Sequence, residues 1–160
     1  MERHWKYLKY VVRHKWYVLI ECCKFGIPIR GLLHDLSKFK PAEWFPYVDY
    51  FYGDKPSPRS ADGSYDPLSV GEDFDYAWLS HQHCNKHHWQ YWILWGDLGR
   101  TKCLPMPLRY TKEMLADWRG AGKALSGKDD TLNWYQLNKD KMQLHEATRI
   151  WIEQQLWLRR

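Results

Sequence analysis

Apolar side chains recur every three or four positions at the start of this sequence, and this spacing constrains the fold more than any other feature. Between residues 2 and 25 the recurring positions are Trp5, Leu8, Val12, Trp16, Leu19 and Cys23. The period is that of an α-helix, and Gly26 and Pro28 follow in the order that ends one. No segment alternates apolar and polar residues between hairpin turns, so the pattern predicts helices and no sheet.

The rest of the chain continues this helical pattern. Residues 28–39 are expected to form a short helix, because Pro28 suits a first turn and the segment has an apolar side. That side consists of Leu32, Leu33, Leu36 and Phe39. Further helices are expected at residues 41–52, 72–95 and 108–125, with one or two more after residue 130.

Residues 53–71 change to Gly, Pro, Ser and Asp, which predicts a long loop. Such a loop in a compact domain is often a lid or binding loop, and a surface insertion is the alternative. A chain of 160 residues suits one domain. We therefore predict a single all-α domain over residues 1–160, with about six to seven helices.

Composition indicates the cellular location of the protein more than it indicates an activity. The net charge is +5 and the basic residues are spread along the chain, so nucleic-acid binding is possible but not indicated. No stretch has the roughly 18 apolar residues of a membrane span, and the N-terminus lacks the apolar core of a signal peptide. The four cysteines form no CxxC pair, and Cys22 and Cys23 are expected to be buried. These features predict a cytoplasmic protein without a membrane partner.

The segment GLLHDLSKF carries the sharpest candidate site. His34 and Asp35 are adjacent on the expected helix, and Lys38 follows them by four and three residues, so all three can reach one side. A His-Asp pair also occurs by chance in many proteins. The pair therefore indicates a metal site only if other potential ligand residues accompany it.

Two further residues are expected on buried helix faces. His14 is at helical spacing from Tyr7, Val11 and Val18, where a lone histidine is more often a satisfied core residue than a ligand. Asp117 stands among Met114, Leu115 and Trp118. Burying a lone carboxylate is costly, so Asp117 is expected to be paired, capping a helix, or bound to a metal.

The segment SHQHCNKHH, residues 80–88, supplies four histidines. His81, Asn85 and His88 share one face if the helix is continuous, and His87 can replace His88 if the helix breaks near Asn85. A solvated polar face is the alternative. The neighbouring aromatic residues favour burial, and these are Trp78, Trp89, Tyr91 and Trp92.

The order of these residues resembles the ligand order of the HD superfamily of metal phosphohydrolases. The chain also resembles the DUF5662 family of bacterial and phage proteins over most of residues 10–150. The resemblance lies in HKWYV, HDLSKFKPAEWFPYVDYFYG, the WL…HQ…N…HHWQYW block and PMPLRYTKEMLADW…GAGKA. Ser80 and Lys86 depart from the expected pattern, which leaves the outer histidine assignments open.

The HD resemblance implies that the helices form an HD-type bundle. It also implies one or two divalent ions, of Mn, Fe, Co, Ni or Zn, because imidazole and carboxylate ligands suit such metals. The implied ligands are His14, His34, Asp35 and Asp117 for one ion, and Asp35, His81 and His88 for the other. Asp35 would bridge the ions and take part in catalysis.

The same resemblance suggests roles for the polar residues nearby. Lys38 would contact a phosphate oxygen during catalysis, unless it is an ordinary surface lysine. Glu113 would orient a histidine or donate a proton, unless it faces solvent. Asn85 and His87 are candidates for substrate binding.

These assignments predict a hydrolase that cleaves a nucleotide phosphomonoester or phosphodiester, with a cyclic or dinucleotide signal as one candidate. The first alternative is a non-enzymatic module whose structural zinc supports contact with nucleic acid or a protein partner. The second is a metal-free helical interaction protein. The substrate, the metal and the oligomeric state stay open at this point.

Overall fold

The computed structural model describes residues 1–158, which form seven α-helices and one short hairpin. The helices are α1 (Glu2–Lys24), α2 (Pro28–Leu33), α3 (Pro41–Tyr52), α4 (Glu72–Cys84), α5 (Leu108–Ser126), α6 (Thr131–Asn138) and α7 (Glu146–Trp157). The predicted all-α fold with six to seven helices is confirmed. None of the described helices has the length and apolar character needed to cross a membrane.

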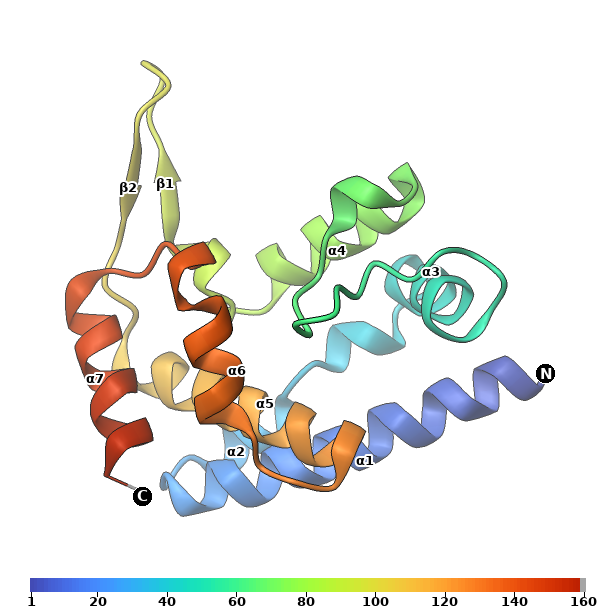
Figure 1. Ribbon diagram of the computed structural model, residues 1–160, viewed down its shortest axis with the longest axis horizontal. Helices are drawn as coiled ribbons and strands as arrows, with labels where there is room; N and C mark the ends of the chain where they lie inside the picture. The colour runs from blue at the N-terminus through green and yellow to red at the C-terminus, as the bar shows by residue number, and fades with distance from the viewer. Residues whose placement is uncertain (159–160) are drawn as a thin grey trace.

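Helix α1 is the longest element, and α5 and α2 pack directly against it (Figure 1). Two glycines permit the close approach. A Cβ on Gly120 of α5 would lie 2.5 Å from Val18 Cγ2, and one on Gly31 of α2 would lie 2.7 Å from Cys22 Cβ. Because any larger residue would push these helices apart, the two glycines set the positions of α5 and α2 against α1.

The buried face of α1 is not the one that the apolar spacing suggests. Trp5, Val12 and Trp16 are 56%, 55% and 59% exposed, and Cys23 is exposed as well. The face that packs into the protein contains Tyr7, Val11, His14, Val18, Glu21 and Cys22. Helix α1 thus has apolar residues on two sides, and the packing of α3 and α5 selects the side that carries His14.

The helix predicted over residues 28–39 is interrupted. Helix α2 ends at Leu33, Asp35 adopts a left-handed conformation with φ of 52°, and a 3₁₀ turn follows at Leu36–Phe39. Aspartate tolerates this conformation better than most residues. Consecutive side chains of a helix point about 100° apart, so the break allows His34 and Asp35 to face the same interior point. The predicted apolar side of this segment is exposed.

The helix predicted over residues 72–95 is also shorter than expected. Helix α4 ends at Cys84, Asn85 is extended, and a 3₁₀ turn at Trp89–Trp92 leads into a hairpin. Its strands β1 (Ile93–Trp95) and β2 (Thr101–Cys103) pair antiparallel and extend away from the helices (Figure 1). The prediction of no sheet was therefore wrong, because three-residue strands are too short to show alternation.

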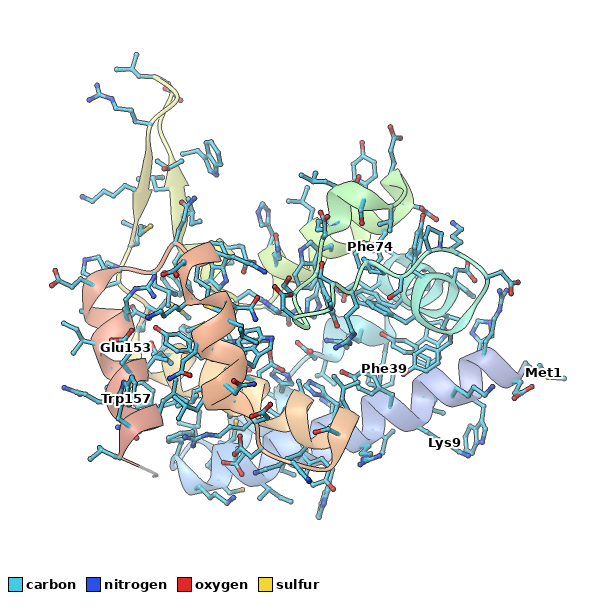
Figure 2. The ribbon with its side chains drawn as sticks, in the orientation of Figure 1. Met1, Lys9, Phe39, Phe74, Glu153 and Trp157 are labelled. Carbon is cyan, nitrogen blue, oxygen red and sulfur yellow. The ribbon has the colours of Figure 1, made fainter. Side chains whose placement is uncertain are left out.

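Two apolar cores flank the centre of the molecule. One joins α1, α3 and α4 and is built from Tyr7, Val11, Tyr47, Val48, Tyr50, Phe74 and Ala77. The other joins α5, α6 and α7 and includes Met114, Leu115, Tyr135, Ile152 and Leu156. Figure 2 labels Phe74, a residue of α4 that belongs to the first core. A third, smaller cluster of Val18, Cys22 and Ala116 joins α1 to α5, and the protein also buries histidines and carboxylates, among them His14, His34, Asp35 and His81.

Residues 53–71 form the predicted loop, with a short 3₁₀ turn at Pro67–Ser69. The loop reaches the last part of the chain at Asp62, whose carboxylate pairs with Lys141 and whose carbonyl accepts from Asn138 Nδ2 at 3.2 Å. Arg59 and Tyr65 form an isolated antiparallel bridge within it. The loop thereby links the α3–α4 side of the molecule to the α6 side.

Candidate metal centre

The candidate ligands come from four separate parts of the chain. His14 lies on the inner face of α1, His34 and Asp35 at the break after α2, and Asp117 on α5. A further set lies at the end of α4 and in the turn after it, and consists of His81, His87 and His88. These residues form two groups of potential ligand atoms that share Asp35.

The first, the α1–α5 group, consists of His14, His34, Asp35 and Asp117. His14 Nε2 lies 3.1 Å from Asp117 Oδ1, and His34 Nε2 lies 3.3 Å from both Asp117 Oδ1 and Asp35 Oδ2. The two Nε2 atoms are 3.3 Å apart. Atoms bound at about 2.1 Å to one ion stand about 3.0 to 3.4 Å apart, so these spacings fit a single cation.

The second, the α4 group, consists of Asp35, His81, His87 and His88. Asp35 Oδ1 lies 3.4 Å from His87 Nε2 and 3.6 Å from His81 Nε2. Among the described residues, Asp35 Oδ1, His87 Nε2 and His88 Nε2 are buried without a hydrogen-bond partner, because these close contacts lack hydrogen-bond geometry. Buried polar atoms rarely stay unsatisfied, and here they point to one place, which suits a bound cation.

The sequence left open whether His87 or His88 is a ligand, and the structure places both in the α4 group. The end of α4 at Cys84 removes the shared helical face of His81 and His88, and the following turn brings back both His87 and His88. His87 is the more central, since its Nε2 also lies 3.8 Å from Asp117 Oδ2. Its expected role in substrate binding therefore gives way to a position among the ligand atoms.

Glu113 lies behind the histidines and does not face solvent. It is 2% exposed, and its Oε1 lies 3.3 Å from His34 Nδ1 and 3.5 Å from His87 Nδ1. Arg30 donates to its other oxygen. Burial opposes its ionisation, but the bonds from His34 and His87 outweigh this and lower the pKa of Glu113. An ionised Glu113 keeps both Nε2 atoms directed at the ligand groups and is unsuited to donate a proton.

Glu43 supports His81 of the α4 group as Glu113 supports His34 and His87. The sequence pattern did not identify Glu43 as part of the site. Its Oε2 accepts from His81 Nδ1 at 2.8 Å and from Ser37 Oγ at 3.0 Å. Asn85, expected to bind substrate, instead donates from Nδ2 to Ser37 Oγ at 2.8 Å and to the His81 carbonyl at 2.9 Å. The signal for Glu43 was a carboxylate within the apolar segment PAEWF, the same signal that identified Asp117.

Lys38 is part of the centre and is not a surface lysine. Its side chain is 12% exposed, pairs with Asp35 Oδ2, and places Nζ 3.4 Å from His81 Nε2. Burial disfavours the charged amine, but the carboxylate of Asp35 outweighs burial and raises the pKa of Lys38. Lys38 therefore carries its positive charge at neutral pH, next to both ligand groups.

The two ligand groups open into one cavity of about 680 Å³. Its base contains Lys38 and ligand residues from both groups, which are His14, His81, His87, His88 and Asp117. Its walls are strongly aromatic and include Tyr10, Tyr47, Phe51, Tyr65, Trp78, Trp89, Trp118 and Trp134. Arg59 and Lys141, from the long loop and the turn after α6, also line it. The centre is thus reachable by a molecule that combines flat rings with negative charge.

A family model described as "Family of unknown function (DUF5662)" matches residues 3–157. The chain belongs to the DUF5662 family. It matches no curated protein and no solved structure. The matched range of the DUF5662 model includes both ligand groups and both supporting glutamates, so the whole centre lies within the family's domain.

In this DUF5662 chain the structure brings together all six residues expected to bind metal. These are His14, His34, Asp35, His81, His88 and Asp117. Lys38 lies beside them, Glu113 lies behind them, and Asn85 is not among the residues that line the cavity. His87, which the sequence offered as an alternative to His88, joins it in the α4 group, and Glu43 and Ser37 are the additions that only the structure supplies.

Proposed function

We propose that this DUF5662 protein is a metal-dependent phosphohydrolase of the HD superfamily that cleaves a nucleotide phosphomonoester or phosphodiester. One observation carries the proposal: two groups of imidazole and carboxylate atoms share the buried Asp35, and residues of both groups line an aromatic cavity. A purely structural site has no need of a substrate-sized cavity beside it. The mixed nitrogen and oxygen donors suit Mn, Fe, Co, Ni or Zn.

In this proposal His14, His34, Asp35 and Asp117 hold one ion, and Asp35, His81, His87 and His88 hold a second. Bound ions would neutralise phosphoryl oxygens and lower the pKa of a water molecule toward neutrality. Asp35 has an oxygen directed to each group, Oδ2 to the first and Oδ1 to the second. A carboxylate that bridges two ions needs one oxygen directed at each of them.

Lys38 supplies fixed positive charge to the reaction. It lines the cavity, and the Asp35 carboxylate holds its amine in place. In the transition state of phosphate-ester cleavage, negative charge builds up on oxygens at the reacting phosphorus. A preorganised ammonium next to those oxygens stabilises the transition state more than the ground state.

The cavity walls favour a nucleotide over a small inorganic phosphate. Trp78 and Tyr47 lie next to His81, with ring centroids 5.7 Å and 6.0 Å from the imidazole. Tyr10 stacks against His14 at 5.9 Å. A base stacked on such rings would leave its phosphate near the ligand groups, which is the arrangement that hydrolysis needs.

The non-enzymatic alternative, with one structural zinc, has less support. A structural zinc takes four protein ligands in a closed site, whereas this chain offers a second group and an open cavity. A bacterial cytoplasm is part of the proposal, since all four cysteines are free and a reducing compartment preserves them.

The test begins with elemental analysis of protein purified without a histidine tag, followed by assays on a panel of nucleotides with Mn or Ni added. We expect one to two ions per chain and hydrolysis of at least one nucleotide. Asp35→Asn should lose both properties, and the exposed hairpin variant Asp97→Asn should keep them. A protein that binds no divalent metal would rule the proposal out.

A further inference from the structure

The outer side of α1 and α2 exposes large apolar side chains that the protein's own cores do not use. Trp5, Val12 and Trp16 of α1 and Ile29, Leu32 and Leu36 after it are each at least half exposed. We call these six residues the outer apolar surface. Scattered apolar residues are normal on a protein surface, but a contiguous set marks a site of interaction.

The α1 and α2 parts of this surface are continuous. Leu19 of α1 lies against α2, where a Cβ on Gly31 would be 3.2 Å from Leu19 Cδ1. Lys15 Nζ donates to the Leu32 carbonyl at 3.3 Å, on the same side of α1. Leu19 is one helical turn from Trp16, so the apolar residues of α1 and α2 adjoin at Leu19.

This part of the chain also carries the protein's net positive charge. Residues 1–41 contain nine Lys and Arg and three Asp and Glu, a net +6, whereas residues 42–160 contain 15 and 16, a net −1. Relative to length, residues 1–41 are both richer in basic residues and poorer in acidic residues than the rest of the chain. Of the three acids, Glu21 and Asp35 are buried, which leaves Glu2 as the exposed acid among residues 1–41.

Five of the nine basic residues pair with carboxylates, whereas Lys9 and Arg13 lie along the edge of the apolar stripe on α1. Val12 and Trp16 are seven and eleven residues after Trp5, so they lie within about 20° of it around the helix. Lys9 and Arg13 follow Trp5 by four and eight residues and lie about 40° and 80° to one side. Lys9 Nζ lies 5.1 Å from the Trp5 ring centre, and Figure 2 shows Lys9 directed away from the other helices.

We propose that the outer apolar surface docks on an anionic lipid bilayer, with its tryptophan and aliphatic side chains at the headgroup boundary. Tryptophan and leucine beside a row of Lys and Arg are typical of helices that lie in a membrane interface. The basic edge adds attraction to anionic headgroups. This departs from the expectation of no membrane partner, which rested on spanning segments and on the signal-peptide pattern and did not consider peripheral binding.

Two other occupants fit the surface less well. A second copy of the chain would bring one positively charged edge against another, which costs free energy. A single-stranded nucleic acid would satisfy the charge and could stack on Trp5 and Trp16, but the other four residues of the surface are aliphatic and offer no ring to a base. An anionic bilayer satisfies both the aliphatic side chains and the charge.

Docking in this way leaves the candidate metal centre free. His14 is nine residues after Trp5 on α1, so its side chain points about 180° away from the outer stripe. His14 is buried and lines the cavity, whereas Trp5 and Trp16 are exposed. The membrane-facing and cavity-facing sides of α1 are therefore opposite sides of one helix.

Vesicle flotation tests the proposal on the full chain. We expect binding to vesicles of phosphatidylcholine with 30% phosphatidylglycerol, and little binding to phosphatidylcholine alone. The double variant Trp5→Ser, Trp16→Ser should bind the anionic vesicles about tenfold or more weakly. The double variant Lys9→Gln, Arg13→Gln should lose about fivefold for each charge removed and keep a folded circular dichroism spectrum.

The matched control removes two exposed apolar residues elsewhere, with Trp95→Ser, Leu98→Ser on the hairpin, and should bind vesicles like the parent. Equal binding to neutral and anionic vesicles, or equal loss in the hairpin control, would overturn the proposal. So would a concentration-dependent dimer in light scattering that the Trp5, Trp16 variant abolishes. Oligonucleotide binding that the same variant abolishes, without vesicle binding by the parent, would assign the surface to nucleic acid.

Discussion

The two ligand groups share Asp35 but differ in charge. The α1–α5 group combines two carboxylates with two imidazoles, and the α4 group combines one carboxylate with three imidazoles. Burial favours neutral His34, yet Asp35 and Asp117 outweigh burial and raise its pKa well above 6.5. Burial and the charge of Lys38 lower the pKa of His81 well below that value. The first group attracts cations strongly, whereas in the second group the pKa values of both His81 and His88 are lowered, which leaves their nitrogens neutral and ready to bind metal.

The two supporting carboxylates, Glu113 and Glu43, also differ, because their pKa values are shifted in opposite directions. Glu113 pairs with Arg30 and contacts two histidines, and its pKa is lowered although burial acts against this. Glu43 contacts His81 and Ser37, and burial raises its pKa. The centre therefore has an ionic half around Asp117 and a more weakly charged half around His81. We expect tight metal binding in the first half and weaker binding in the second.

Asp35→Asn should have the largest effect, because it removes the charge on which both halves depend. The amide has nearly the same volume, so the fold should persist, while hydrolysis falls by about three powers of ten or more. Nucleotide assays and thermal unfolding of the same preparations measure both properties. A variant that melts far below the parent, from a parent without activity, would instead indicate a structural metal.

Asp117→Asn and His88→Gln should separate the halves. Asp117→Asn removes one of two carboxylates from the α1–α5 group, so we expect loss of the tightly bound ion and most activity. His88→Gln leaves that group intact, and we expect one retained ion and a smaller loss of activity. Elemental analysis after dialysis against a weak chelator distinguishes the two. Equal metal content in both variants would remove the distinction between the halves.

Glu113→Gln and Glu43→Gln should weaken metal binding without removing a ligand. Loss of such a supporting carboxylate typically lowers metal affinity about 10- to 100-fold. Glu113→Gln should be the more severe, since it affects His34 and His87 and leaves Arg30 without its charged partner. Competition against a metal indicator measures both affinities, and the reverse order would contradict the contrast between the two glutamates.

The pH dependence of the metal-free protein should show opposite signs for the two halves. The pKa of His34 is raised, so its contribution to stability is present below pH 6.5 and disappears as pH rises through the folded-state pKa. Burial and His87 lower the pKa of His88, so this residue costs stability as pH falls below 6.5.

Melting curves in a chelator between about pH 5 and about pH 9 test these signs. His34→Gln should flatten the decline on the alkaline side, and His88→Gln should flatten the decline on the acidic side. These effects should be the smallest of the series, because each concerns one proton. If both variants flatten the same side, the charge difference between the halves is wrong.

The sequence by itself determined the helical class, the ligand types and their order along the chain. His14 beside Tyr7 and Val11, and Asp117 beside Met114 and Leu115, stand at spacings that a helix converts directly into a buried face. Those inferences needed only local geometry, and for that reason the structure retains them.

Tertiary structure decided how the ligands meet. The left-handed turn at Asp35, the end of α4 at Cys84 and the pairing of His81 with Glu43 depend on groups distant in the sequence. Packing also decided which side of α1 is buried, since both sides carry apolar residues at helical spacing. Periodicity describes one element at a time, whereas burial and ligand convergence are properties of several elements packed together.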